Sequence, residues 1–269
     1  LFAPFGSDRG AMRVWALGVN AQGQAAQAVW LLVAEPGAGP VTPGLAALAA
    51  VKAIAAKTLA PGARPFGPDD LDLASIQAEI DRHPISVTRT EDRSALFWRA
   101  LGDDFDQLPE ALRALHETSG LSVWRGQARV DGPANWVAGL VGRLIGFPAR
   151  GGEAPVEVMI DAGATRSIWR RRIGQARFAS RLSSPEPGGQ IRERFGFLTM
   201  KLQLQVQGER LAYLMQGWSL GVLPLPKALA PRTETHEAVD GEGRFTFDVD
   251  ISMPIVGCLV RYRGWLTRQ

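Results

Sequence analysis

Cysteine is almost absent from the sequence, which contains only Cys258 among its 269 residues. A single thiol excludes a disulfide within the chain, and it also excludes a zinc site built from several cysteines. Cys258 lies in the apolar segment 253–260. This setting favours a buried structural thiol over a nucleophile, because free cysteine in apolar surroundings behaves as a small hydrophobic residue.

Long hydrophobic runs are missing as well. A membrane-spanning helix needs about 18 or more consecutive apolar residues, whereas the longest candidate, residues 45–59, is rich in alanine and contains Lys52 and Lys57. No signal-peptide pattern opens the sequence. We therefore expect no transmembrane segment and a cytoplasmic bacterial protein. The sequence begins at Leu1 within a patterned segment, so we also expect it to be a piece of a longer protein.

Neither sign of charge dominates, since 30 basic residues face 27 acidic ones and the net charge is +3. Nucleic-acid binding requires basic residues gathered on one face together with aromatic side chains. The best local cluster is Trp169–Arg172, which we interpret as a strand whose charges point to solvent. We expect no nucleic-acid partner.

Motifs of known catalytic chemistry are absent too. The glycines of segment 139–146 lie in an amphipathic helical pattern with no strand before them, so they are not a dinucleotide fingerprint. There is no phosphate-binding loop and no Gly-x-Ser-x-Gly element. His83, His116 and His236 are far apart, and none has a partner at metal-ligand spacing. The catalytic residues are thus unknown. We expect no metal and no cofactor in this chain, with NAD(P) relevant only if an upstream Rossmann domain exists.

The first third of the sequence predicts a hairpin followed by helices. Residues 11–34 alternate as two strands around a turn at Asn20–Gly23. A helix is expected from Thr42 to Leu59, with Pro43 in its first turn, and a second from residue 70 or 72 to Arg82.

The polar segment 85–93 separates this part from the remainder, which predicts two domains, 1–90 and 94–269. The second domain has helical patterns at 107–116 and 133–145. In the latter, an apolar side expected to pack against the sheet is formed by Trp136, Leu140, Leu144, Val137 and Val141. Strand patterns follow at 156–160, 167–182, 190–207, 210–220, 243–253 and 259–266. The fold class is therefore α+β: a small hairpin-plus-helices segment, then a curled or barrel-like antiparallel β-sheet domain packed by helices.

Large aromatic side chains are plentiful, with eight tryptophans and eleven phenylalanines against two tyrosines. The second domain contains, among others, Trp124, Trp136, Trp169, Trp218 and Trp265. A curled sheet lined by such residues with a few polar ends is typical of a pocket for an apolar ligand. A fully packed core explains the same composition equally well.

Two ionisable residues stand out within the β-rich part. Glu193 lies between Arg192 and Arg194, so the alternation of a strand turns it away from both. It is either a buried acid that marks a site, or an outward glutamate or ion-pair partner of Arg171. His116 ends a predicted helix, where an imidazole is favourable without any function. The candidate ligand-binding residues are Trp169, Arg171, Glu193, His116, Tyr262 and Trp265.

The opening of the sequence resembles the final section of bacterial saccharopine dehydrogenase-like proteins over about residues 1–82. The residues that carry the resemblance are Pro4–Gly10, Met12–Val14, Trp30–Ala34, Gly39–Pro40, Thr42–Pro43 and Pro61–Pro65. In that family this section follows a nucleotide-binding domain. The Rossmann half has no counterpart in this sequence, so the resemblance attributes no dehydrogenase activity to the chain itself.

The remainder, about residues 96–269, resembles the family known as domain of unknown function 4166. The carrying residues are Phe105, Leu108–Pro109, Leu112–Arg113, Leu115–His116, Trp169, Arg171, Gly174, Phe178, Ser180, Glu193, Gly196, Gly221, Pro224–Pro226, Phe245, Phe247–Val249, Pro254, Gly257 and Tyr262–Leu266. Ile173 stands where the family has phenylalanine. The resemblance implies a shared fold and no established activity.

These observations favour an accessory or ligand-binding domain, for a small apolar molecule, attached to an oxidoreductase-like remnant. The alternative is the C-terminal part of an NAD(P)-dependent oxidoreductase whose nucleotide-binding domain is missing from this chain. A third hypothesis, an enzyme that uses Glu193, Arg171 and His116, requires these three to converge in one cleft. A homo-oligomer is a further hypothesis, because the early hairpin presents strand edges.

Overall fold

The computed structural model describes residues 8–60, 62, 67, 69–149, 151–163, 165–184 and 188–269. Residues 4–7, 61 and 63–65, which belong to the saccharopine dehydrogenase-like pattern, lie outside the described residues. The chain divides into two compact units. The first contains the chain up to Ala16 together with Ala28–Glu91, and the second contains Leu17–Gln27 and Asp92–Gln269.

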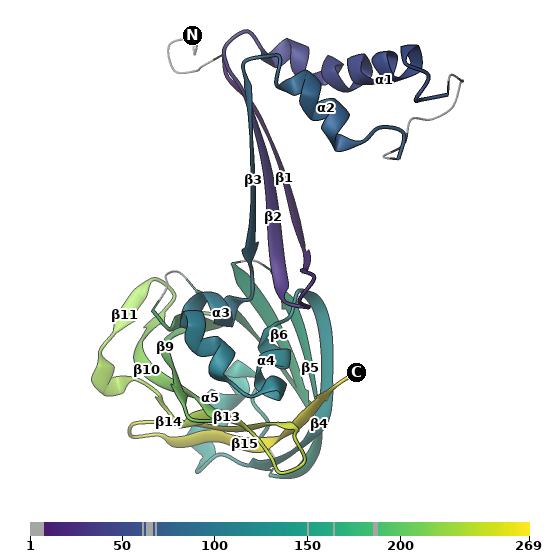
Figure 1. The fold of residues 1–269 in the computed structure, drawn as a ribbon. Coiled ribbons are helices and arrows are strands. Elements are labelled where there is room, and N and C mark those ends of the chain that lie inside the picture. The colour runs from purple at the N-terminus through teal and green to yellow at the C-terminus, as the bar shows by residue number, and fades with distance from the viewer. Residues whose placement is uncertain are drawn as a thin grey trace. The chain divides into compact units, whose positions relative to one another are not determined.

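A three-stranded antiparallel sheet forms the strand part of the first region, in the order β1-β2-β3 (Figure 1). The predicted hairpin is confirmed as β1 (Gly10–Val19) and β2 (Ala25–Ala34). Its turn forms because the Asn20 side-chain oxygen accepts hydrogen bonds from two backbone N–H groups that follow it, at 3.0 and 2.9 Å. The third strand, β3 (Ile85–Arg93), occupies the segment 85–93, for which the sequence predicted a polar boundary and no strand.

Two helices complete the first unit. A short 3₁₀ helix, η2 (Gly39–Gly44), leads into α1 (Leu45–Ala55), which ends four residues before the predicted end at Leu59. The second helix is α2 (Leu73–Ile80), and the side chain of Asp72 caps it by accepting from the Ser75 N–H at 2.6 Å. The buried apolar core of this unit consists of Leu32, Ala34, Ala38, Leu45, Ile80 and Ile85.

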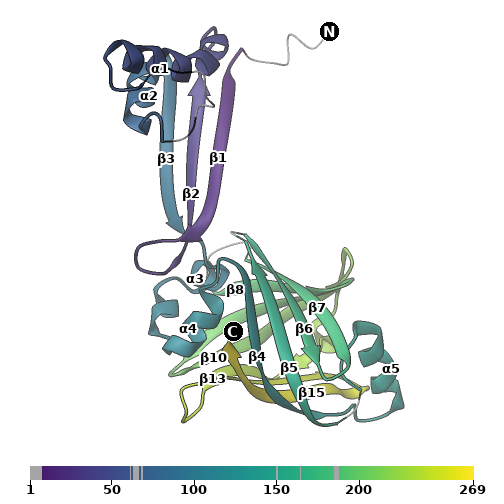
Figure 2. The ribbon, with the colours of Figure 1, turned by 90° about the vertical axis from the view of Figure 1, so that its right-hand side faces the viewer.

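The second unit is a closed antiparallel β-barrel of ten strands (Figures 1 and 2). The sheet closes because β10 pairs with both β9 and β13. In spatial order the strands are β10 (Arg210–Leu220), β13 (Thr235–Val239), β14 (Phe245–Met253), β15 (Gly257–Arg268), β4 (Gly120–Asp131), β5 (Gly152–Ala162), β6 (Arg166–Ile173), β7 (Ala176–Ser183), β8 (Gln190–Phe195) and β9 (Leu198–Gln207).

Two strands of this barrel, β4 and β13, fall in segments for which the sequence predicted no strand. Two short strands extend it: β11 (Leu223–Leu225) pairs with β10, and β12 (Arg232–Thr233) pairs with β14, with the 3₁₀ turn η4 (Lys227–Leu229) between them.

Helices lie at both ends of the barrel. At one end, α3 (Leu96–Leu101), the 3₁₀ helix η3 (Gly102–Gln107) and α4 (Glu110–His116) precede β4, and they contact strands β8, β9, β13 and β14. At the other end, α5 (Trp136–Ile145) connects β4 to β5 and lies beside the ends of β6 and β7 (Figure 2).

Because antiparallel strands alternate in direction, the turns that join β6 to β7, β8 to β9, β10 to β11 and β14 to β15 lie at the same end of the barrel as α5. We call this end the α5 rim.

The packing face of α5 differs from the prediction. Its buried residues are Ala138 and Gly142, and of the predicted apolar side only Val141 packs against the core, whereas Trp136, Val137, Leu140 and Leu144 are exposed. The small residues permit close approach, since a Cβ at Gly142 would already contact the Leu259 carbonyl oxygen at 3.5 Å. No helix in the described part of the chain is long and apolar enough to cross a membrane.

Candidate functional site

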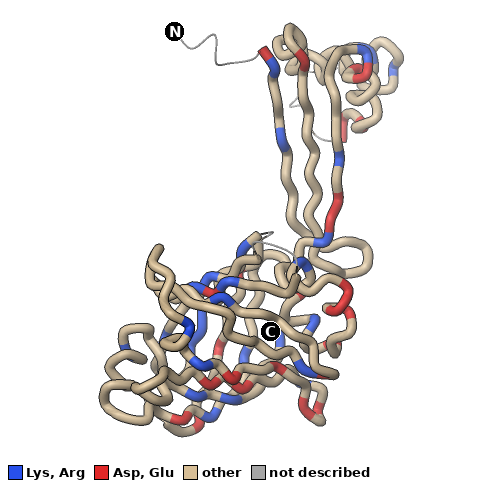
Figure 3. The backbone as a smooth tube through the Cα atoms, turned by 90° about the vertical axis from the view of Figure 1, so that its left-hand side faces the viewer, with Lys and Arg blue, Asp and Glu red and all other residues tan. Residues whose placement is uncertain are grey.

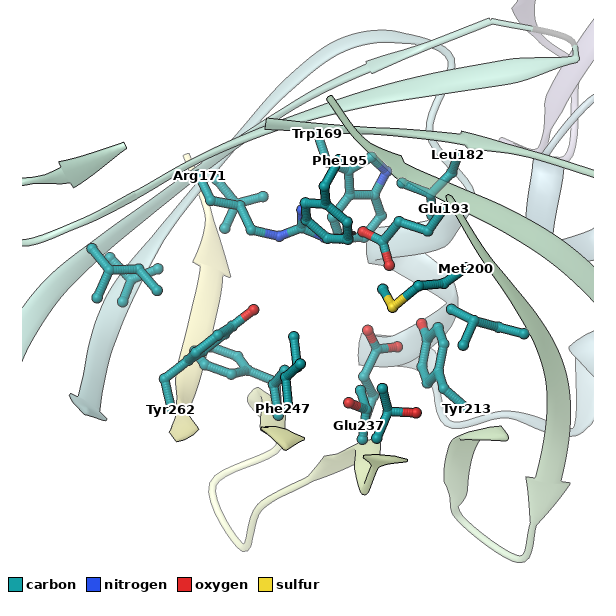
Figure 4. Close-up of a pocket in the computed structure, with 18 of the residues that line it drawn as sticks. Trp169, Arg171, Leu182, Glu193, Phe195, Met200, Tyr213, Glu237, Phe247 and Tyr262 are labelled. Atoms are coloured by element: carbon teal, nitrogen blue, oxygen red, sulfur yellow. Dashed lines mark hydrogen bonds and ion pairs between the residues drawn. The ribbon is translucent and has the colours of Figure 1, made fainter. Parts of the chain in front are cut away.

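A cavity occupies the interior of the barrel (Figure 4). It contains about 830 Å³ of empty space counted out to its mouth, and the centre of a water molecule can occupy about 80 Å³ of it. One water needs roughly 10–15 Å³ by that measure. The cavity is therefore large enough for several waters or for a slim small molecule. Its wall is mainly apolar and includes Val156, Val158, Ile173, Leu182, Phe195, Met200, Leu202, Phe245, Phe247, Val249, Ile251 and Leu266.

Charged and phenolic side chains are set into this apolar wall. Five such side chains come from five different strands: Arg171 from β6, Glu193 from β8, Tyr213 from β10, Glu237 from β13 and Tyr262 from β15. Strand alternation places each of them inside, because successive side chains point to opposite faces. In β6, for example, the two arginines that flank Arg171 are exposed. Figure 4 shows Arg171 and Glu193 on one side of the open space, with Tyr262 and Glu237 across from them.

Arg171 is held by neighbours on several sides. Its Nη1 donates to Ser180 Oγ at 2.7 Å, and its Nη2 donates to Glu193 Oε1 at 3.3 Å. The guanidinium also lies 5.0 Å from the centroid of the Trp169 ring and 5.8 Å from that of Phe178. A planar guanidinium favours such stacking together with ion pairing. The cation is thereby fixed against one wall, and Glu193 is positioned beside it.

His116 joins α4 to the same polar cluster through Glu237. Its Nε2 lies 2.6 Å from Glu237 Oε2, and because a carboxylate only accepts, Nε2 donates this bond. The buried imidazole contacts both Phe97 and Trp169, with ring centroids 3.7 and 5.7 Å away. Its Nδ1 has no partner within the described part of the chain. A small cavity beside the ring has about the volume that one water needs.

The two tyrosines are both neutral over the ordinary pH range. Burial raises the pKa of Tyr262 to about 12. Burial also raises the pKa of Tyr213 well above its usual value, and the adjacent Glu237 carboxylate raises it further through its charge and a hydrogen bond. In Figure 4 the Tyr262 hydroxyl points into the open space. No other described residue hydrogen-bonds to it, so this phenol is available to a bound molecule.

The structure brings most of the predicted residues together. Trp169, Arg171, Glu193 and Tyr262 line the cavity. His116 is not part of the wall, but it contacts Trp169 and Glu237, which are. Of the alternatives for Glu193, the acid is buried inside the barrel and paired with Arg171 at the same time.

Trp265 lies elsewhere. The next residue along β15, Leu266, lines the cavity, so alternation turns Trp265 to the outside of the barrel. There the guanidinium of Arg244 covers its ring at 4.5 Å from the centroid.

Two residues of the cluster were missed in the sequence. Tyr213 shares the inward face of its strand with Leu211, and this alternation is visible in the predicted strand 210–220. Glu237 left no such signal, because its five-residue strand has only one buried position.

No metal site is evident in the described ranges, because no group of three or more His, Cys, Asp or Glu side chains there is placed to hold an ion. The thiol of Cys258 is partly buried, which raises its pKa and disfavours the reactive thiolate.

Comparisons with known proteins agree with one of the two resemblances. The family described as domain of unknown function 4166 matches residues 108–266. No comparison supports the saccharopine dehydrogenase-like resemblance of residues 1–82. No curated protein matches the chain. Among solved structures, the crystal structure of Rv2717c from M. tuberculosis is similar with 16% sequence identity and a TM-score of 0.36, over 60% of this chain and 99% of that chain.

Proposed function

We propose that this chain, which belongs to the family described as domain of unknown function 4166, binds a small and largely apolar molecule inside its barrel. The observation that carries the proposal is an apolar cavity whose wall contains a compact set of ionisable groups. Burying charged side chains in a protein is costly unless they are paired. Arg171, Glu193 and Glu237 all face this space, and a bound polar group completes their interactions.

The charges of the wall favour a ligand whose polar end donates hydrogen bonds. Two carboxylates, Glu193 and Glu237, face the cavity, against the single cation of Arg171. Arg171 already donates to Ser180 and Glu193. One oxygen of Glu237 is engaged by His116. A hydroxyl or amine on the ligand finds an acceptor at the second Glu193 oxygen, whereas a ligand carboxylate meets an excess of negative charge.

A matched series of eight-carbon ligands tests this proposal. Octylamine, 1-octanol and octanoate share one apolar chain and differ only in the polar end. We expect the purified protein to bind octylamine and octanol more tightly than octanoate in calorimetric titrations, and native mass spectrometry to reveal one bound molecule per chain. Absence of binding for all three would contradict the proposal, and tightest binding of octanoate would contradict the assigned polarity.

Two carboxylate variants make the test specific to the cavity. Glu193→Gln removes the inward negative charge, and we expect it to weaken octylamine binding by about tenfold. Asp248→Asn is the matched control, because Asp248 lies in β14 between the cavity-lining Phe247 and Val249 but pairs with Arg261 at 2.9 Å on the other face. We expect the control to bind octylamine as the unmodified protein does.

An accessory role beside an oxidoreductase is the second part of the proposal. It is supported only by the sequence pattern of residues 1–82. Sequencing the source DNA upstream tests it: a strand, a Gly-x-Gly-x-x-Gly turn and a helix encoded in the same reading frame support it, and an unrelated upstream sequence removes it.

A further inference from the structure

Large apolar side chains are exposed along α5 at one rim of the barrel. Trp136, Leu140 and Leu144 are spaced four residues apart, which places them on one stripe of the helix. Trp136 is 80% exposed and Leu144 74% exposed. An apolar stripe on a surface helix normally covers a core, but in α5 the opposite face does so, with Ala138 and Gly142 buried and Val141 and Ile145 packed against the core. The outer stripe therefore has no partner within the barrel.

Three turns of the same rim carry exposed apolar side chains as well. Phe197 lies in the β8–β9 turn, Val222 in the β10–β11 turn and Ile255 in the β14–β15 turn. Val222 is fully exposed and Ile255 is 97% exposed. A hydrogen bond joins the β14–β15 turn to the helix: Asn135, which caps α5, donates from Nδ2 to the Val256 carbonyl oxygen at 2.9 Å.

Ile255 is in addition strained. Its φ is +73°, a left-handed backbone conformation that is rare for a β-branched residue and costs about 1–2 kcal/mol. Glycine or asparagine fits such a position better. Packing inside the protein does not offset this cost, because the side chain is almost fully in solvent. An isoleucine at the tip of this turn is understandable if the side chain is buried against something outside the chain.

Basic residues outnumber acidic ones at the rim. The five segments that form it are 133–149, 172–177, 194–201, 218–231 and 253–258. Together they contain six basic residues and no Asp or Glu, the basic ones being Arg143, Arg172, Arg177, Arg194, Lys201 and Lys227. Directly beside these segments, the same end of the barrel also carries the three acids Asp131, Glu153 and Glu234. The turns at the opposite end of the barrel carry Glu209, Asp240 and Glu242 together with Arg244. Charged positions along the chain can be followed in Figure 3.

We propose that the α5 rim docks onto the surface of a membrane that contains anionic lipids. Separate protruding apolar tips suit insertion into the interfacial region of a bilayer, whereas a protein partner is normally met by a continuous complementary face. Lysine and arginine around such tips are attracted to anionic headgroups, with about 1 kcal/mol for each residue near the surface. The exposed apolar side chains and the basic residues of the rim thus both favour an anionic membrane surface as the partner.

The rim also borders the barrel cavity. A groove beneath α5 is lined by Leu144, Phe197 and Leu220, and it shares Phe195, Met200 and Ile251 with the cavity. If the proposed ligand function holds, the docked end is the one through which an apolar molecule passes between bilayer and barrel. The docking itself does not depend on that function.

Flotation of the full chain with lipid vesicles tests the docking. We expect the protein to float with vesicles of phosphatidylcholine and phosphatidylglycerol, and to do so less with pure phosphatidylcholine. Raising the salt concentration from ~0.05 M to ~0.5 M is expected to weaken the binding, because the shorter Debye length screens the rim charges. The double variant Val222→Asn/Ile255→Asn is expected to lower the partition coefficient by about tenfold or more.

A matched control lies at the opposite end of the barrel. Leu121 in β4 is a similarly exposed apolar residue there, and Leu121→Asn is expected to leave vesicle binding unchanged. Unfolding cannot explain a loss of binding in the rim variant, because Ile255→Asn relieves the backbone strain and is expected to keep or raise the thermal midpoint.

Three results would overturn the proposal. One is absence of flotation with anionic vesicles, and another is equal flotation of the rim variant and the unmodified chain. The third is a concentration-dependent dimer that the rim variant abolishes, which would make the rim an interface between copies of this chain. Ligand binding is measured without vesicles, so failure of docking and failure of the proposed function remain distinguishable.

Discussion

At the scale of single residues, His116 and Glu237 depend on each other. The imidazole is buried, and its Nε2 is 2.6 Å from the Glu237 carboxylate. In His116→Ala the carboxylate keeps its burial but loses this donor, and a cavity opens beside Phe97 and Trp169. We expect the free energy of unfolding of the barrel to fall by about 3 kcal/mol, measured by guanidinium denaturation.

The isosteric variant of the acid serves as the control. Glu237→Gln keeps an oxygen that can accept from His116, so it is expected to cost only about 1 kcal/mol. If His116→Ala stays within that smaller range, the pair does not stabilise the barrel as the geometry indicates.

The two tyrosines give a residue-scale prediction for pH. Tyr213 and Tyr262 are the only tyrosines in the sequence, and burial raises the pKa of both. A titration of phenolate absorbance should therefore detect almost no ionisation of the folded protein at about pH 10, the ordinary tyrosine pKa. The same chain in guanidinium should titrate normally, and phenolate formation at about pH 10 without denaturant would contradict the buried placement.

This titration has a consequence for stability. The folded pKa of Tyr262, about 12, lies above the unfolded value, so the neutral phenol contributes stability that is complete below about pH 10. That contribution is lost as the pH rises through 12. We expect Tyr262→Phe to make unfolding less dependent on pH in this window.

At the scale of elements, the pairing of β4 with β15 requires glycine. A Cβ at Gly264 would overlap with the Gln127 carbonyl oxygen, and one at Gly126 would overlap with that of Trp265. Gly264→Ala therefore forces β4 and β15 apart in the middle of their pairing. We expect a loss of about 4 kcal/mol or more, or failure to fold, seen by denaturation and circular dichroism.

A glycine with space around it provides the comparison. Gly217 in β10 meets only the flexible end of Lys201, at 4.0 Å. Gly217→Ala is expected to change stability by less than about 1 kcal/mol. Equal effects of the two substitutions would show that β4 and β15 are not held this closely.

At the scale of the whole molecule, the two cores are separate. The first unit has six buried apolar residues in its cluster, and the barrel has a much larger cluster of its own. We expect two transitions in calorimetry, the smaller unit melting first because it buries less apolar surface. Ile80→Ala should lower only the first midpoint and Leu211→Ala only the second. A single transition that both variants shift would contradict this division.

Sequence patterns predicted elements well where burial follows one regular period. In the predicted strand 243–253, Phe245, Phe247 and Val249 alternate regularly with polar residues; in the structure these three line the cavity and Asp248 pairs with Arg261 on the other face. Strand β4 escaped prediction because small or polar residues dilute its inward face: Ser122 is buried, and Gly126 occupies an inward register position. Strand β3 escaped because only Ile85 is buried.

By itself the sequence determined the features that depend on neighbours along the chain. These are the hairpin turn at Asn20, the Asp72 cap of α2 and the inward direction of alternating strand residues. Tertiary structure alone decided that the sheet closes, that Arg171 meets Glu193 from another strand, and that Glu237 meets His116 from a helix. The physical reason is that the period of a strand is set locally, whereas register, closure and the exposed face of α5 depend on strands that are distant in sequence.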